Sequence, residues 1–111
     1  MFLTLLSANK NDQYVLLISF DGFRADYIDW YDTPNFDQIK LNGVKAKSLK
    51  PVFPTKTFPN HYSIATGMYI ENHGLIGNNF FDEKLKQFYT LKDRNKVEDE
   101  RFYGGEPVWA T

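Results

Sequence analysis

The chain has 111 residues, the length of one ordinary domain, and its 42% hydrophobic and 24% charged residues are typical of a globular protein and not of a disordered one. It contains no cysteine, which excludes disulfides, thiolate metal sites and cysteine nucleophiles. Its 13 basic and 14 acidic residues give a net charge of -1, which argues against a dedicated nucleic-acid-binding protein.

The apolar N-terminal segment, residues 1–8, gives way abruptly to the polar segment 9–12. We interpret residues 1–8 either as the remnant of a signal peptide, with Ser7-Ala8 as the cleavage edge, or as a non-native leader. The first interpretation predicts a secreted or periplasmic protein whose domain occupies residues 9–111. No apolar run in the sequence reaches the roughly 18 residues that a membrane-spanning helix needs.

The next segments follow the order strand, helix, strand. Residues 14–20 form a nearly continuous apolar run, which is typical of a strand buried on both faces in a parallel sheet. Thr33-Pro34 predicts the start of a helix over 34–41, and weak alternation over 44–49 indicates a second strand. This is the β-α-β unit of a three-layer α/β fold. The apolar side chains that we expect the helix to bury are Phe36, Ile39 and Leu41.

The second half of the sequence predicts a constrained loop, a helix and a hairpin. Three prolines within residues 51–59 restrict the backbone there, and a short helix over 59–66 would end at Gly67. Two β-forming segments within residues 80–91 predict an antiparallel hairpin. The mostly charged segment 92–101 is typical of a solvated loop.

Three polar residues could carry chemistry, although each also has a simpler structural interpretation. Asp21 follows the first strand, where α/β sheets bind ligands and where a carboxylate suits zinc, but it could also stabilise the turn at Gly22. Thr57 stands beside a helix start, as a nucleophile at an anion site or simply as an N-cap. Asn78 could donate its amide to a phosphoryl oxygen or form a turn.

The two histidines, His61 and His73, do not have a recognisable zinc-binding spacing, and we expect both to make local hydrogen bonds.

Taken together, the order and the residue sequences of five segments resemble the nucleotide pyrophosphatase/phosphodiesterase family of the alkaline phosphatase superfamily. The resemblance covers residues 14–111, and its block Pro-Thr-Lys-Thr-Phe-Pro-Asn-His is highly specific. The five segments are residues 18–27, 33–36, 54–67, 71–82 and 105–109.

The resemblance implies a fold, a set of site residues and a chemistry. The chain would be the amino-terminal part of a three-layer α/β/α alkaline-phosphatase-like fold. Asp21 matches a zinc ligand, and Thr57 matches the nucleophile that binds the same zinc and forms a phosphothreonine intermediate. Asn78 matches the asparagine that binds the phosphoryl oxygen, and Phe58 matches an aromatic residue that stacks on the base of a nucleotide. The complete enzyme would hold two Zn²⁺ and act on a nucleotide or another small phosphodiester.

The family's remaining zinc ligands lie downstream of the matching block, so we expect this chain to be a fragment that lacks a full metal site and is inactive alone. The helix-like start at residues 105–111 also indicates truncation. Alternatives are an inactive binding module of the same fold, or a phosphomonoesterase, phosphonate hydrolase or lipid phosphodiesterase of the superfamily. A sulfatase would need a modified cysteine or serine where Thr57 stands.

Overall fold

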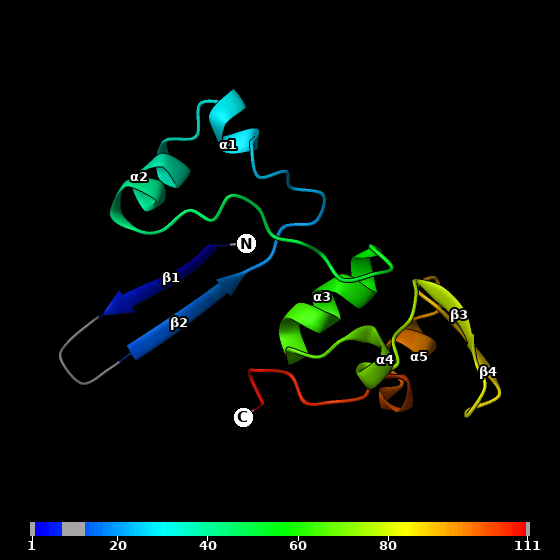
Figure 1. Cartoon of the computed structure of the whole chain (residues 1–111). Helices are drawn as coiled ribbons and strands as arrows, with labels where there is room; N and C mark the ends of the chain where they lie inside the picture. The colour runs from blue at the N-terminus through cyan, green and yellow to red at the C-terminus, as the bar shows by residue number, and fades with distance from the viewer. Residues whose placement is uncertain (1, 8–12, 111) are drawn as a thin grey trace. The chain divides into compact units, whose positions relative to one another are not determined.

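The structure of the chain is a computed structural model that describes residues 2–7 and 13–110, and the side chains of residues 14–110. The chain divides into two compact units, Met1–Lys50 and Pro51–Thr111, which we describe separately (Figure 1). Each unit contains both strands and helices, as the predicted α/β class requires. Among the described residues, no helix is long and apolar enough to span a bilayer.

The first unit begins with an antiparallel strand pair. Strand β1 (Phe2–Ser7) pairs with β2 (Gln13–Ile18), with Phe2 opposite Ile18. The predicted leader therefore contains β1, whereas Met1 and Ala8 lie outside the described residues.

The strand expected at 14–20 is present as β2, but its expected burial on both faces is wrong. Among the described residues β2 has one partner strand, and a two-stranded ribbon covers little of either face. Its exposed side chains include Tyr14, Val15, Leu16 and Ile18.

Two helices complete the first unit, α1 (Tyr27–Trp30) and α2 (Pro34–Asn42). The predicted start of α2 is confirmed, since Thr33 occupies the N-cap position and Pro34 is the first helical residue. The expected burial of its apolar face is wrong: Leu41 is 75% exposed and α2 has no buried residue. The half-buried Phe36 joins a cluster of rings with Phe20 and Phe23.

Residues 44–49 do not form the predicted second strand. The Val44 side chain is 92% exposed, and the Lys45 ammonium lies 2.6 Å from a carboxylate oxygen of Asp29. Three lysines between residues 45 and 50 leave too little apolar surface on either face to hold a strand in place. The β-α-β unit is therefore not completed by this segment within the described residues.

The second unit contains two helices, a hairpin and two short helical turns. In the hairpin, Phe80 pairs with Tyr89 across the antiparallel strands, which confirms the predicted pairing. Their rings join Leu75 and Phe102 in the buried core of this unit. The elements are α3 (Thr57–Thr66), α4 (Ile70–His73), β3 (Asn79–Asp82), β4 (Gln87–Thr90), α5 (Arg94–Val97) and the 3₁₀ turn η1 (Glu100–Phe102).

Local caps explain where these helices agree with the prediction and where they do not. Helix α3 ends as predicted at Gly67, which takes the left-handed conformation at φ 67°, but it begins two residues earlier than predicted. The charged segment 92–101 contains α5 and η1 instead of a loop. Asp93 and Asp99 cap them by accepting backbone N–H bonds at 3.0 and 3.2 Å. Residues 107–110 form a turn and not a helix.

Candidate active site

Thr57 is the first residue of α3, and the N-cap position before it belongs to Lys56. The interpretation of Thr57 as an N-cap is therefore wrong. The first N–H groups of a helix have no partner within the helix, and they form the positive end of its dipole. The first turn of α3 carries no acidic residue that would neutralise this end. The half-buried Thr57 thus stands where an anion is favoured.

A second asparagine, which the sequence analysis missed, holds the loop that precedes Thr57. The Asn60 side-chain oxygen accepts a hydrogen bond from the Val52 N–H at 3.2 Å, and the Asn60 N–H donates to the Lys56 carbonyl at 3.1 Å. Asn60 thereby ties the proline-rich loop back onto the first turn of α3. The position of Asn60 in the first turn of the helix was the one sequence feature that could have indicated this role. Nothing in the sequence shows that the loop folds back to it.

Asn78 meets the same helix start from a distant part of the chain. Its side-chain oxygen accepts a hydrogen bond from the Phe58 N–H at 3.2 Å, which is one of the N–H groups without a partner inside α3. Its backbone oxygen accepts from the Leu91 N–H at 3.1 Å, beside the end of the hairpin. Because the oxygen end of the amide faces Phe58, the NH₂ end is the one that can donate. The structure therefore brings Asn78 to the residue next to Thr57.

Phe58 has a structural role in addition to the predicted one. The half-buried ring packs against the core cluster of the second unit, which is formed by Leu75, Phe80, Tyr89 and Phe102. Stacking on a nucleotide base stays a prediction for this residue.

Asp21 lies in the first unit, in a turn that follows β2, directly before Gly22 at φ 62°. Its side chain is exposed. The described residues contain no group of three or more His, Asp or Glu side chains that could hold a metal ion. Its assignment as a zinc ligand therefore stays a prediction.

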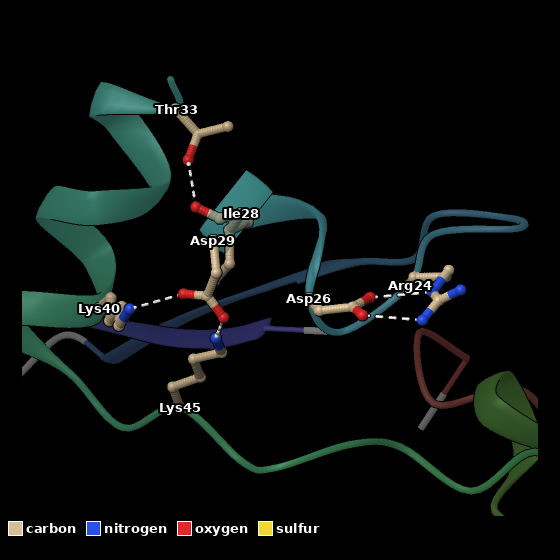
Figure 2. Close-up of polar contacts among 7 residues, drawn as sticks. All are labelled: Arg24, Asp26, Ile28, Asp29, Thr33, Lys40 and Lys45. Carbon is tan, nitrogen blue, oxygen red and sulfur yellow. Dashed lines mark hydrogen bonds and ion pairs between the residues drawn. The ribbon is translucent and has the colours of Figure 1, made fainter. Parts of the chain in front are cut away.

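Other carboxylates of the first unit are engaged by neighbouring cations (Figure 2). Asp29 receives Lys40 at 2.9 Å and Lys45 at 2.6 Å, and these hydrogen bonds, that of Lys45 foremost, lower the pKa of its carboxyl group. Asp26 accepts two hydrogen bonds from the Arg24 guanidinium, at 2.9 and 2.7 Å. Both carboxylates thus have their charge balanced by cations of the same unit.

His73 makes local hydrogen bonds, as expected. It is 1% exposed; its Nε2 lies 2.8 Å from the Ser63 hydroxyl and its Nδ1 accepts from the Leu75 N–H at 3.1 Å. Burial lowers the pKa of the imidazole below its ordinary value. With both nitrogens engaged, the ring has no free position for a metal.

A family model described as type I phosphodiesterase/nucleotide pyrophosphatase matches residues 15–111. The chain belongs to this family. The family identified from the motifs is therefore confirmed.

Individual members of the family are similar to the chain over most of its length. It is 46% identical over 99 residues to venom phosphodiesterase of Naja atra, covering 87% of this chain and 12% of that protein. It is 43% identical over 105 residues to bis(5'-adenosyl)-triphosphatase of Mus musculus, covering 95% of this chain and 23% of that protein. The chain therefore spans between about a tenth and a quarter of these curated relatives.

Solved structures of the family agree with the fold. Murine ectonucleotide pyrophosphatase/phosphodiesterase 5 matches with a TM-score of 0.76 at 42% identity, over 83% of this chain and 25% of that one. An inactive threonine-to-alanine variant of the murine protein in complex with AMP matches with a TM-score of 0.75. The predicted fold class, the amino-terminal part of an alkaline-phosphatase-like α/β fold, is thus confirmed.

Proposed function

We propose that the protein to which this chain belongs hydrolyses phosphodiester or pyrophosphate bonds of nucleotides through a phosphothreonine intermediate on Thr57. The observation that carries the proposal is the hydrogen bond between the Phe58 N–H and the Asn78 side-chain oxygen. It joins the residue beside the hydroxyl nucleophile to an amide donor at the positive end of α3. Family membership supports the reaction class.

The chemistry has two balanced steps. The Thr57 oxygen loses its proton and forms a bond to phosphorus, while the bond from phosphorus to the leaving oxygen breaks and that oxygen takes up a proton. Water then attacks the phosphothreonine, which releases the phosphate product and restores the threonine hydroxyl. The Asn78 NH₂ group donates to a non-bridging oxygen as negative charge builds there, and the first turn of α3 favours the same charge.

Two Zn²⁺ belong to this proposal. When bound, they lower the pKa of a coordinated hydroxyl and stabilise charge on oxygen. The resemblance implies two zinc donors in this chain, the carboxylate of Asp21, a ligand type that zinc accepts, and the hydroxyl oxygen of Thr57. A catalytic zinc takes three protein ligands, and the described residues hold no group of three His, Asp or Glu side chains that could supply them.

The substrate proposal is a nucleotide. The murine relative binds AMP, and Phe58 stands directly after the proposed nucleophile, where a partly exposed ring can stack on a base. Placement outside the cytoplasm, secreted or periplasmic, is supported by relatives named ectonucleotide enzymes.

The test compares three threonine variants of the protein at its natural length, assayed on a nitrophenyl phosphodiester. We expect Thr57→Ala to reduce turnover to background because it deletes the attacking oxygen, and Thr57→Ser to keep measurable activity. Thr55→Ala, an exposed threonine in the same loop, is the matched control and should leave turnover unchanged. Near-normal turnover in Thr57→Ala, with an unchanged melting temperature, would refute the covalent mechanism.

A further inference from the structure

His73 is a buried polar residue that the proposed chemistry does not use. Its Nδ1 accepts the Leu75 N–H, so this nitrogen carries no proton. In the neutral ring the proton then lies on Nε2, which donates to the Ser63 hydroxyl 2.8 Å away on α3. The two contacts therefore select one charge state and one tautomer.

The ring and the backbone of His73 are both held in place. The Tyr62 ring of α3 meets the imidazole edge to face, with 5.0 Å between the ring centroids. The His73 carbonyl accepts a hydrogen bond from the Gly104 N–H at 2.8 Å. A Cβ at Gly104 would lie 3.0 Å from that carbonyl oxygen, so only glycine allows this close approach without a shift.

The segment that follows His73 is attached to α3 at both of its ends. At one end, His73 contacts Ser63 and holds the Leu75 N–H, and Leu75 itself is 0% exposed in the core. At the other end, the Asn78 side chain accepts the Phe58 N–H. Ser63 and Phe58 belong to the same helix, so α3 is a common frame for both attachments.

We infer that His73 is a positioning residue that fixes the segment 74–78 through the Leu75 N–H and thereby sets where the Asn78 amide lies at the start of α3. The inference rests on the proposed function, in which Asn78 donates to the phosphoryl oxygen. A donor to developing charge acts in the transition state, so its misplacement lowers kcat and leaves KM nearly unchanged.

Two substitutions separate the two hydrogen bonds of the ring. In His73→Asn the side-chain oxygen takes the place of Nδ1 and can still accept the Leu75 N–H. In His73→Gln the longer amide reaches toward Ser63 and leaves the Leu75 N–H without its acceptor. For the protein at its natural length, we expect His73→Asn to keep kcat within about threefold. We expect His73→Gln to lower kcat at least about tenfold with KM within about twofold.

A double-mutant cycle tests whether the effect passes through Asn78. In an Asn78→Ala background, His73→Gln should lower kcat by less than about twofold further, because the group that it positions is gone. If His73→Gln lowers kcat equally in both backgrounds, or if both His73 variants lose kcat to the same extent, the inference is overturned.

Amide hydrogen exchange separates this inference from the proposed function. In His73→Gln, exchange at the Phe58 N–H should accelerate at least about tenfold relative to the Asn60 N–H, which is bonded within the same turn of α3. An Asn78→Ala variant with unchanged kcat would refute the proposed role of Asn78 and leave the exchange result standing. If His73→Gln changes the exchange rates of the Phe58 and Asn60 N–H groups by the same factor, the positioning role of His73 is overturned, whatever the activity.

Discussion

Burial of the His73 ring makes the stability of the second unit depend on pH. The pKa of His73 lies below its ordinary value of 6.5 because burial disfavours the charged ring, and Glu71 on its own helix only partly offsets this. Tyr62 faces the ring from α3 and Tyr103 lies beyond it, and burial raises the pKa of the Tyr62 phenol, which keeps it neutral. Below pH 6.5 the unfolded chain therefore binds the proton more readily than the folded one.

The free energy of unfolding should consequently be highest above about pH 7 and should fall as the pH drops below 6.5 toward the lowered pKa of His73. Urea unfolding at pH 7.5 and 5.5 measures the difference. His73→Asn should flatten the dependence, whereas the control His61→Asn, on the neighbouring helix α3, should retain it. An equally steep dependence in His73→Asn would assign it to other groups.

Phe58 packs against the core and is also predicted to stack on a base, so its test needs a substitution that keeps the packing. Phe58→Leu retains an apolar side chain against the core cluster but loses the flat ring. We expect nucleotide substrates to lose about 1–3 kcal/mol of binding, the usual contribution of base–aromatic stacking, while a nitrophenyl phosphodiester without a base is affected less. Steady-state kinetics on both substrates provide the comparison. Equal losses on both would make Phe58 a core residue and nothing more.

At the scale of elements, a chain of two hydroxyl groups joins the hairpin to α5. The Tyr103 hydroxyl donates to the Val97 carbonyl at 2.8 Å, so it must accept from the Tyr89 hydroxyl, also at 2.8 Å. Tyr103→Phe leaves the buried Tyr89 hydroxyl without an acceptor and should cost about 1–3 kcal/mol of stability. Tyr89→Phe leaves the bond to Val97 intact and should cost only about 0.5–1.5 kcal/mol. Urea unfolding that ranks the two variants in the opposite order would contradict this donor sequence.

Elements whose ends are marked by proline, glycine or a turn sequence were predictable from the sequence. Proline at the start of α2, glycine at the end of α3 and the turn inside the hairpin each specify backbone geometry within a few residues. The prediction of a strand over residues 44–49 failed because weak alternation of apolar and polar residues does not specify a strand without a partner strand. The short helices α5 and η1 were missed because their aspartate caps stand within a run of charges.

The candidate site was predictable only in part. Through the family resemblance, the sequence predicts Thr57 as the nucleophile and Asn78 as a phosphoryl-binding residue, and both stay predictions. The hydrogen bond from Phe58 to Asn78 joins residues 20 positions apart. Such a contact depends on how α4 and the hairpin pack, which local patterns do not encode. The tautomer of His73 and the tie from Asn60 to the proline loop depend on tertiary structure in the same way.

At the scale of the whole molecule, the carboxylates and imidazoles of the chain determine what metal it can hold. Asp26 and Asp29 are paired with cations, and both nitrogens of His73 are engaged. The zinc donors named in the proposal are the carboxylate of Asp21 and the hydroxyl of Thr57. The described residues hold no group of three metal-binding side chains of the His, Asp or Glu type.

We therefore expect the 111-residue chain by itself neither to bind two zinc ions tightly nor to hydrolyse a phosphodiester. Two oxygen donors fall short of the three protein ligands that a catalytic zinc takes, and without the ion Thr57 keeps the high pKa of an alcohol. In the proposed mechanism Asn78 and the start of α3 would stabilise charge on oxygen, but neither removes the hydroxyl proton. Elemental analysis of the purified chain gives the zinc stoichiometry, and a nitrophenyl phosphodiester assay gives the turnover. Two bound zinc ions per chain, or turnover that Thr57→Ala abolishes, would show that the chain contains further ligands, because the two donors named here cannot hold both ions.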